Sequence, residues 1–72
     1  MSDRIVIDPE VCGGRPIVAG TRMRVIDVLD ALAEGASVDE LVADFPYLTR
    51  ADASACLAYA ARSLDHRVVR AA

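Results

Sequence analysis

The sequence contains no lysine, one histidine, two cysteines and no long apolar run. Cys12 and Cys56 fit no CxxC pattern, and His66 alone cannot complete a zinc site with them, so we expect no metal and no cofactor. A structural disulfide is not expected either, and Cys56 follows an apolar helical pattern that is typical of a small core residue. The only early apolar run, residues 5–7, is too short for a signal peptide, and nothing approaches the ~20 apolar residues that cross a bilayer. We therefore expect a cytoplasmic protein with reduced thiols and no membrane contact.

Motifs for catalysis and for phosphate binding are also lacking. The glycine-rich stretch CGGRPIVAGTRMRV, residues 12–25, has neither the GxxxxGKS/T nor the GxG spacing of a phosphate loop, and no helix is expected directly after GGRP. There is no HExxH sequence and no nucleophile–base pair with recognisable spacing. The glycines are better explained as turn residues. We expect a protein that is not an enzyme, with no catalytic residue and no small-molecule substrate.

The length of 72 residues limits the chain to one small domain. A domain of this size buries only ~60% of the surface of its unfolded chain, so its core is marginal without a disulfide, a metal or a partner subunit. The hydrophobic fraction of 54% is high for so short a chain. We therefore expect some apolar surface to contact another chain, in a homodimer or a higher homo-oligomer.

The first part of the chain, residues 1–25, is predicted to form short strands. Turn sequences separate three β-type runs at residues 4–8, 16–19 and 22–25. Alternation along the third run puts Arg22 and Arg24 on one face and Met23 and Val25 on the other. These short strands can fold as a hairpin ahead of the rest of the chain.

The period of apolar residues then changes from two to 3.6, which predicts three helices within residues 26–65. The first helix ends at Gly35, where left-handed backbone is needed. Ser37 starts the second helix with Glu40 completing a capping box, and Thr49 starts the third with Asp52 in the same relation. We expect the third helix to bury one apolar face, made of Ala53, Cys56, Leu57, Ala60 and Leu64.

The resulting prediction is a small α+β fold that is mainly α, forming a single domain over residues 1–72. Short strands or a hairpin occupy residues 1–25, three helices with a homeodomain-like helix–turn–helix occupy residues 26–65, and residues 66–72 form a flexible C-terminal arm.

The short turn between the last two helices is typical of a DNA-binding helix–turn–helix, although an ordinary helical hairpin fits equally. In the first case the third helix enters the major groove, with Thr49, Arg50 and Ser54 close to the phosphates and base edges. Arg22 and Arg24 would add positive charge. Against this interpretation, residues 25–49 carry six acidic side chains and no basic one, which repel the phosphate backbone unless they face away from it.

One combination of residues resembles the domain-of-unknown-function family 433. It spans residues 5–61 and comprises Asp8-Pro9, Cys12-Gly13-Gly14, Pro16, Gly20-Thr21-Arg22, Val25, Gly35, Pro46, Leu48-Thr49 and Tyr59-Ala60. The resemblance implies a winged or homeodomain-like helix–turn–helix fold and a bacterial or archaeal antitoxin role. Members are often encoded beside a PIN-like ribonuclease, which the antitoxin binds and inhibits, and the pair represses its own operon.

The C-terminal arm offers a chemical basis for such inhibition. PIN-type nucleases hold metal ions with clustered carboxylates, and an arginine inserted among these would pair with them bidentately and compete with the metal. Arg67 and Arg70 are the candidates, flanking Val68 and Val69, on an arm that would become ordered on the nuclease surface. A disordered or helix-extending tail is the alternative. A DNA-binding regulator without a toxin and a plain dimeric interaction module are the alternative functions.

Overall fold

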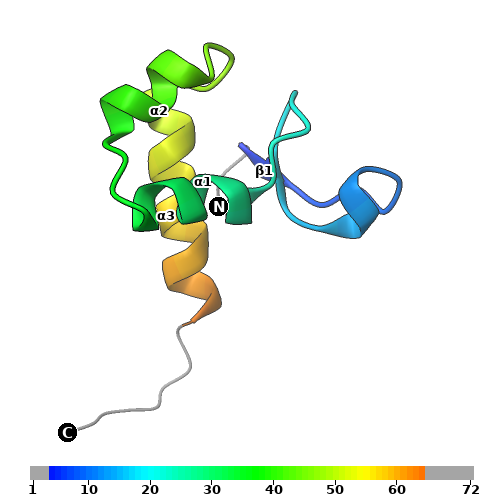
Figure 1. The fold of residues 1–72 in the computed structure, drawn as a ribbon. Helices are drawn as coiled ribbons and strands as arrows, with labels where there is room; N and C mark the ends of the chain where they lie inside the picture. The colour runs from blue at the N-terminus through cyan, green and yellow to red at the C-terminus, as the bar shows by residue number, and fades with distance from the viewer. Residues whose placement is uncertain (1–3, 65–72) are drawn as a thin grey trace, which may run out of the picture.

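The computed structural model describes residues 4–64. A two-stranded antiparallel hairpin precedes three helices, so the fold is small, mainly α and of the α+β class, as predicted (Figure 1). The elements in chain order are β1 (Ile5–Val6), the 3-10 turn η1 (Cys12–Gly14), β2 (Ile17–Val18), α1 (Val25–Ala33), α2 (Val38–Asp44) and α3 (Arg50–Ser63). Within residues 4–64, no helix combines the length and the apolar character needed to cross a membrane. The predicted C-terminal arm, residues 66–72, lies outside the described residues.

The third strand expected at residues 22–25 is reduced to a single bridge between Ile17 and Arg24, so that part of the prediction is wrong. The reason is that α1 already begins at Val25, whose N–H donates to the carbonyl of Pro16 at 2.9 Å. The chain therefore runs beside β2 only where it enters the helix.

The predicted alternation of faces in this segment is confirmed. Val25 is buried, and Met23 packs against the core. Arg22 is exposed and Arg24 is half-buried. The segment thus directs its apolar side chains inward and keeps both guanidinium groups at the surface.

The helix boundaries follow the predicted capping residues. Ser37 Oγ accepts from the N–H of Glu40 at 3.0 Å, and the Glu40 carboxylate accepts from the N–H of Ser37 at 2.9 Å. Thr49 and Asp52 exchange the equivalent bonds at 3.1 and 3.0 Å. These bonds satisfy N–H groups that a helix leaves unpaired in its first turn. Gly35, directly after α1, has a φ of 108°, which side chains with a Cβ rarely adopt.

The core lies where α1, α2 and the first half of α3 meet, with β2 closing one side. Its buried members are Val18, Val25, Val28, Leu41, Leu48, Ala53 and Cys56. Most are β-branched or small, so the three short helices can approach one another closely. Cys56 is the core residue that its helical position predicted.

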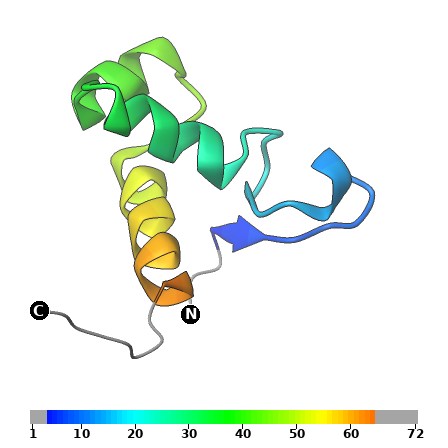
Figure 2. The same ribbon diagram turned by 60° about the horizontal axis from the view of Figure 1, so that its bottom comes forward.

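The predicted buried face of α3 is only partly correct. Cys56 is buried, but Leu57 is 47% exposed and Leu64 is 76% exposed, while Asp52 and Ala55 are buried instead. Two causes are visible. β1 packs on the side of α3 that carries Asp52, and α3 extends beyond the region that α1 covers (Figures 1 and 2). The end of α3 therefore projects with apolar side chains uncovered.

Candidate functional site

Arg24 pairs with the first acidic residue of α1. Its Nε donates to Oδ2 of Asp27 at 3.0 Å and its NH2 group to Oδ1 at 2.8 Å, a bidentate arrangement. These bonds lower the pKa of Asp27 and raise that of Arg24. The backbone N–H of Arg24 also donates to the same carboxylate. Of the two arginines predicted to add positive charge for DNA, Arg22 and Arg24, the latter is thus paired with an acidic residue of the range 25–49.

Arg22, the second hairpin arginine, is exposed and forms no ion pair with any of residues 4–64. Its position is fixed through the backbone. The Thr21 hydroxyl donates to the carbonyl of Val18 at 2.8 Å and accepts from the N–H of Met23 at 2.9 Å, which closes the turn. Cys12 Sγ lies 3.5 Å from the carbonyl oxygen of Arg22. The GTR sequence therefore holds an arginine outward in the turn that follows β2.

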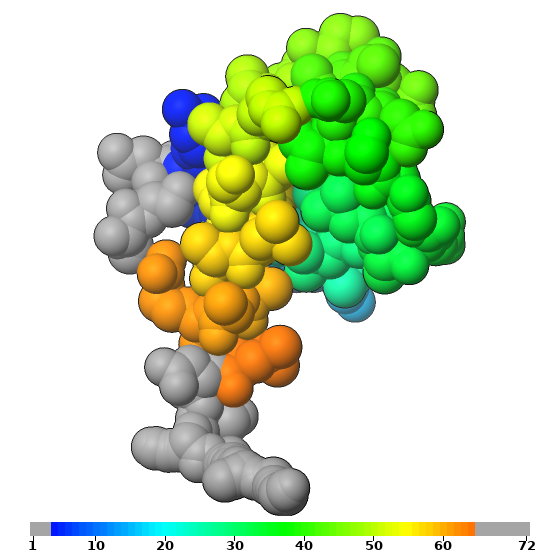
Figure 3. Space-filling view, turned by 90° about the vertical axis from the view of Figure 1, so that its left-hand side faces the viewer, coloured from blue at the N-terminus to red at the C-terminus, as the bar shows by residue number. Residues whose placement is uncertain are grey.

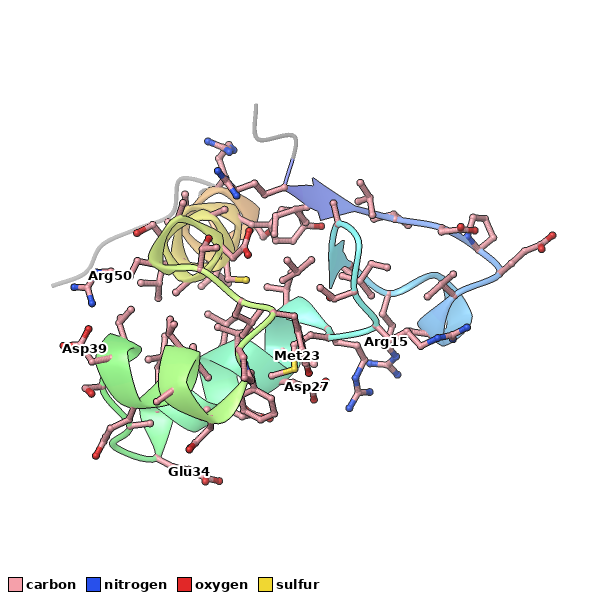
Figure 4. All side chains as sticks on the ribbon, turned by 90° about the horizontal axis from the view of Figure 1, so that it is seen from above. Arg15, Met23, Asp27, Glu34, Asp39 and Arg50 are labelled. Atoms are coloured by element: carbon pink, nitrogen blue, oxygen red, sulfur yellow. The ribbon has the colours of Figure 1, made fainter. Side chains whose placement is uncertain are left out.

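Arg50, the arginine at the start of α3, forms an ion pair with Asp39 of α2 (Figure 4). Thr49 uses its hydroxyl in the N-cap, and Ser54 is exposed one turn further along. In Figure 4, Arg50 lies at the left edge of the molecule, whereas Asp27, the partner of Arg24, lies away from it, close to Met23. The predicted DNA contacts therefore form two separate groups, one on the hairpin and one at α3. The predicted nuclease contacts Arg67, Val68, Val69 and Arg70 lie outside the described residues.

Asp52 has a role that the sequence revealed only in part. Beyond its capping bonds, its Oδ1 accepts from Arg4 NH1 at 3.0 Å, which joins the start of β1 to the first turn of α3. Burial opposes ionisation of this carboxyl group. The bonds from the Thr49 backbone, Arg4 and the Thr49 side chain outweigh that effect, so the pKa of Asp52 lies below its ordinary value. The capping spacing predicted the local bonds, but nothing in the sequence linked Asp52 to a residue 48 positions away.

A second feature that the sequence analysis missed is an apolar groove of about 290 Å³ between α1 and the end of α3. Its walls include Val25, Ile26 and Leu29 from α1 and Tyr59, Ala60 and Leu64 from α3. Arg15 and Pro16 close the end beside the hairpin. Figure 3 shows the C-terminal part of α3 projecting beyond the body formed by α1 and α2. The apolar spacing of α3 beyond Cys56 is the signal that the sequence offers, but it predicts a core face, not a groove.

Neither cysteine forms a disulfide. Burial, reinforced by the nearby charge of Asp52, raises the pKa of Cys56 to about 11. Cys12 is half-buried in η1 and has a φ of 51°. Among residues 4–64 no three His, Cys, Asp or Glu side chains gather in a way that could hold a metal ion.

Comparison with known proteins assigns the chain to a family. No curated protein matches it. The crystal structure of a DUF433 member protein from Anabaena variabilis is similar, with 36% sequence identity and a TM-score of 0.80. The similarity covers 85% of this chain and 60% of that one, so the chain spans about three-fifths of the relative's length. The sequence pattern of the family described as "Protein of unknown function (DUF433)" matches residues 5–60. The resemblance inferred from the sequence is therefore confirmed, and the chain belongs to the DUF433 family.

Proposed function

We propose that this chain is an antitoxin-like protein that binds and inhibits a PIN-like ribonuclease. It acts without catalysis of its own, by placing arginine side chains among the carboxylates that hold the metal ions of the nuclease. The observation that carries the proposal is the division of the arginines into two sets. One set is paired with acidic residues of this chain, and the other is exposed and available to an acidic partner.

The exposed set supports an acidic protein partner. Arg15, Arg22 and Arg62 are exposed and form no ion pair with any other residue in the range 4–64. Arg67 and Arg70 follow α3 in the sequence, four and seven residues after Ser63. A guanidinium group matches a carboxylate bidentately, and the carboxylates of a metal site provide several such partners within a small area.

The paired set makes DNA a less favourable partner. Arg24 and Arg50 pair with Asp27 and Asp39 in positions that water can reach, and such ion pairs contribute little, so a phosphate could displace either carboxylate. Displacement would leave the two carboxylates close to the phosphate backbone, which repels them. Repression of the operon remains the second candidate function, because Thr49 and Ser54 lie in the first turns of α3, as a recognition helix requires.

The proposal requires a PIN-like ribonuclease encoded beside this chain, and that nuclease provides the test. The full chain is expected to abolish its ribonuclease activity at equimolar concentration, and truncation after Leu64 is expected to restore that activity. Arg67→Ala combined with Arg70→Ala should restore most of it, whereas Arg50→Ala, which removes an internally paired arginine, should leave inhibition unchanged. Full inhibition by the truncated chain would show that the arm is not the inhibitory segment. A nuclease unaffected by the full chain would refute the proposed function.

DNA binding needs a separate measurement. A salt titration with the upstream promoter should give weak affinity that falls steeply with ionic strength. If the recognition-helix hypothesis is correct, Arg50→Ala lowers that affinity at low salt. No detectable binding at low salt, or no effect of Arg50→Ala, would exclude it.

A further inference from the structure

The apolar groove between α1 and the end of α3 is a feature that the proposed function does not use. α3 has fourteen residues and α1 has nine, so the inward face of α3 continues after the core has ended. On this uncovered part lie Tyr59, Ala60 and Leu64, opposite Ile26 and Leu29 of α1. Leu64 is 76% exposed and Ile26 is 45% exposed. Two large aliphatic side chains at the rim of an apolar groove are typical of a surface that another protein covers.

We propose that a second copy of this chain covers the groove, with the two α1 helices antiparallel across a two-fold axis. In such an isologous contact each copy uses the same surface patch. A groove in that patch can therefore be filled only if the patch also carries protruding side chains, which enter the groove of the other copy. Ile26 and Leu64 meet that requirement, because each lines the groove and also extends from its rim. In the dimer these side chains enter the groove of the partner while the partner's enter this one.

The charges at the two ends of α1 favour the antiparallel direction. Arg15 lies at the start of the helix, because the carbonyl of Pro16, the next residue, binds the N–H of Val25. Glu34 lies just beyond the other end, about one helix length of ~13 Å away (Figure 4), and Asp30 lies between the two ends. None of these three side chains forms an ion pair with another residue of the range 4–64. Antiparallel α1 helices place Arg15 of each copy beside Glu34 of the other, whereas parallel helices bring like charges together.

The dimer also accounts for the small size of the core. A 72-residue chain leaves an unusually large share of its surface exposed, and association is the common remedy where no disulfide or metal is present. The inference does not depend on the proposed nuclease, because it is argued from α1, the end of α3 and Arg15, whereas inhibition is assigned to Arg67 and Arg70.

Sedimentation equilibrium of the full chain tests this interface. The wild type is expected to be a dimer at micromolar concentration. Ile26→Glu and Leu64→Glu should each raise the dimer dissociation constant at least ~100-fold, because each introduces two carboxylates into an apolar contact. Tyr47→Glu is the matched control, because Tyr47 is 55% exposed, between Ile26 and Leu64, but precedes α3 and so lies away from the groove at its other end. The dimer dissociation constant of this variant should equal that of the wild type. Circular dichroism confirms that each variant is folded.

A charge reversal tests the direction of the helices. Arg15→Glu should weaken the dimer about tenfold, and adding Glu34→Arg should return the dissociation constant to near the wild-type value. A wild-type monomer at micromolar concentration, or a dimer that Ile26→Glu and Leu64→Glu do not weaken, would overturn the proposal. Failure of the double variant to recover would overturn the antiparallel arrangement. Nuclease inhibition by a monomeric Ile26→Glu variant would leave the proposed function intact, so the two ideas can fail separately.

Discussion

Replacement of Asp52 with asparagine removes one negative charge from the point where β1 meets the first turn of α3. The Asp52 residue is 7% exposed, and its carboxylate accepts one bond from the Thr49 backbone and one from Arg4, each at 3.0 Å. Asparagine keeps the shape and can accept one of these bonds through its amide oxygen, but it cannot form the ion pair. The variant therefore isolates the contribution of the charge.

The magnitude follows from the exposure of the two partners. Hydrogen bonds to a charged group contribute ~1.5–3 kcal/mol, and the buried bond to the Thr49 N–H is of this kind. The Arg4 side chain is 50% exposed, so its pair with Asp52 is screened by water and adds at most ~1 kcal/mol. Since asparagine retains part of the first bond, we expect Asp52→Asn to lower the free energy of unfolding by about 1.5 kcal/mol near neutral pH.

The pH dependence has a defined sign. Because the pKa of Asp52 is lower in the folded protein than its ordinary value of 3.8, its contribution is present above that value and is lost as the pH falls through the folded-state pKa. The difference in unfolding free energy between wild type and Asp52→Asn should thus stay constant on the neutral side of 3.8 and shrink in more acidic solution.

Urea unfolding followed by far-ultraviolet circular dichroism, at one fixed protein concentration, measures this difference. Glu40→Gln is the matched control, because Glu40 occupies the same capping position in α2 but is exposed, and it should cost less than ~0.5 kcal/mol. Equal effects of the two substitutions, or an Asp52→Asn effect that does not depend on pH, would refute the assignment of Asp52 as the charged link between β1 and α3.

Three further predictions concern the core, a turn and the thiols. Leu41→Ala should lower the unfolding free energy by ~2–5 kcal/mol, whereas Leu57→Ala on the exposed side of α3 should cost less than ~1 kcal/mol; similar losses in urea unfolding would contradict the observed packing. Gly35→Ala should cost about 1 kcal/mol, because alanine is strained at a φ of 108°, and an unchanged melting temperature would contradict this. In a thiol assay with a disulfide reagent, Cys12 should react in the native protein and Cys56 only after unfolding, since Cys56 is fully buried with a pKa of about 11; rapid reaction of both would contradict it.

The sequence predicted those features whose cause lies within a few residues. Ser37 with Glu40 and Thr49 with Asp52 mark two helix starts correctly, because each pair satisfies backbone N–H groups of its own first turn. Gly35 marks the end of α1 for a similarly local reason. The order of hairpin and helices followed from these signals together with the change in apolar period.

The sequence did not predict features that depend on which elements meet. The partner of Asp52 is Arg4, and no local rule connects residues so far apart. Leu57 and Leu64 satisfied the helical spacing of a core face, but the core ends before Leu64, and β1 packs on the other side of α3 from Leu57. The groove forms because α3 is longer than the elements that cover it. Its presence therefore depends on how the elements pack, which the sequence pattern of α3 alone does not show.

The central claim is that arginines of this chain replace metal ions among the carboxylates of a nuclease, and competition between the two tests it most directly. The chain is titrated by calorimetry into a PIN-like nuclease whose gene neighbours that of this chain, as the proposal requires, at increasing concentrations of the divalent metal that such a nuclease uses. The account predicts tight binding without metal and a progressive loss of affinity as metal is added, because both ligands occupy the same carboxylates. Affinity that is independent of metal concentration, or no binding at all, would contradict it.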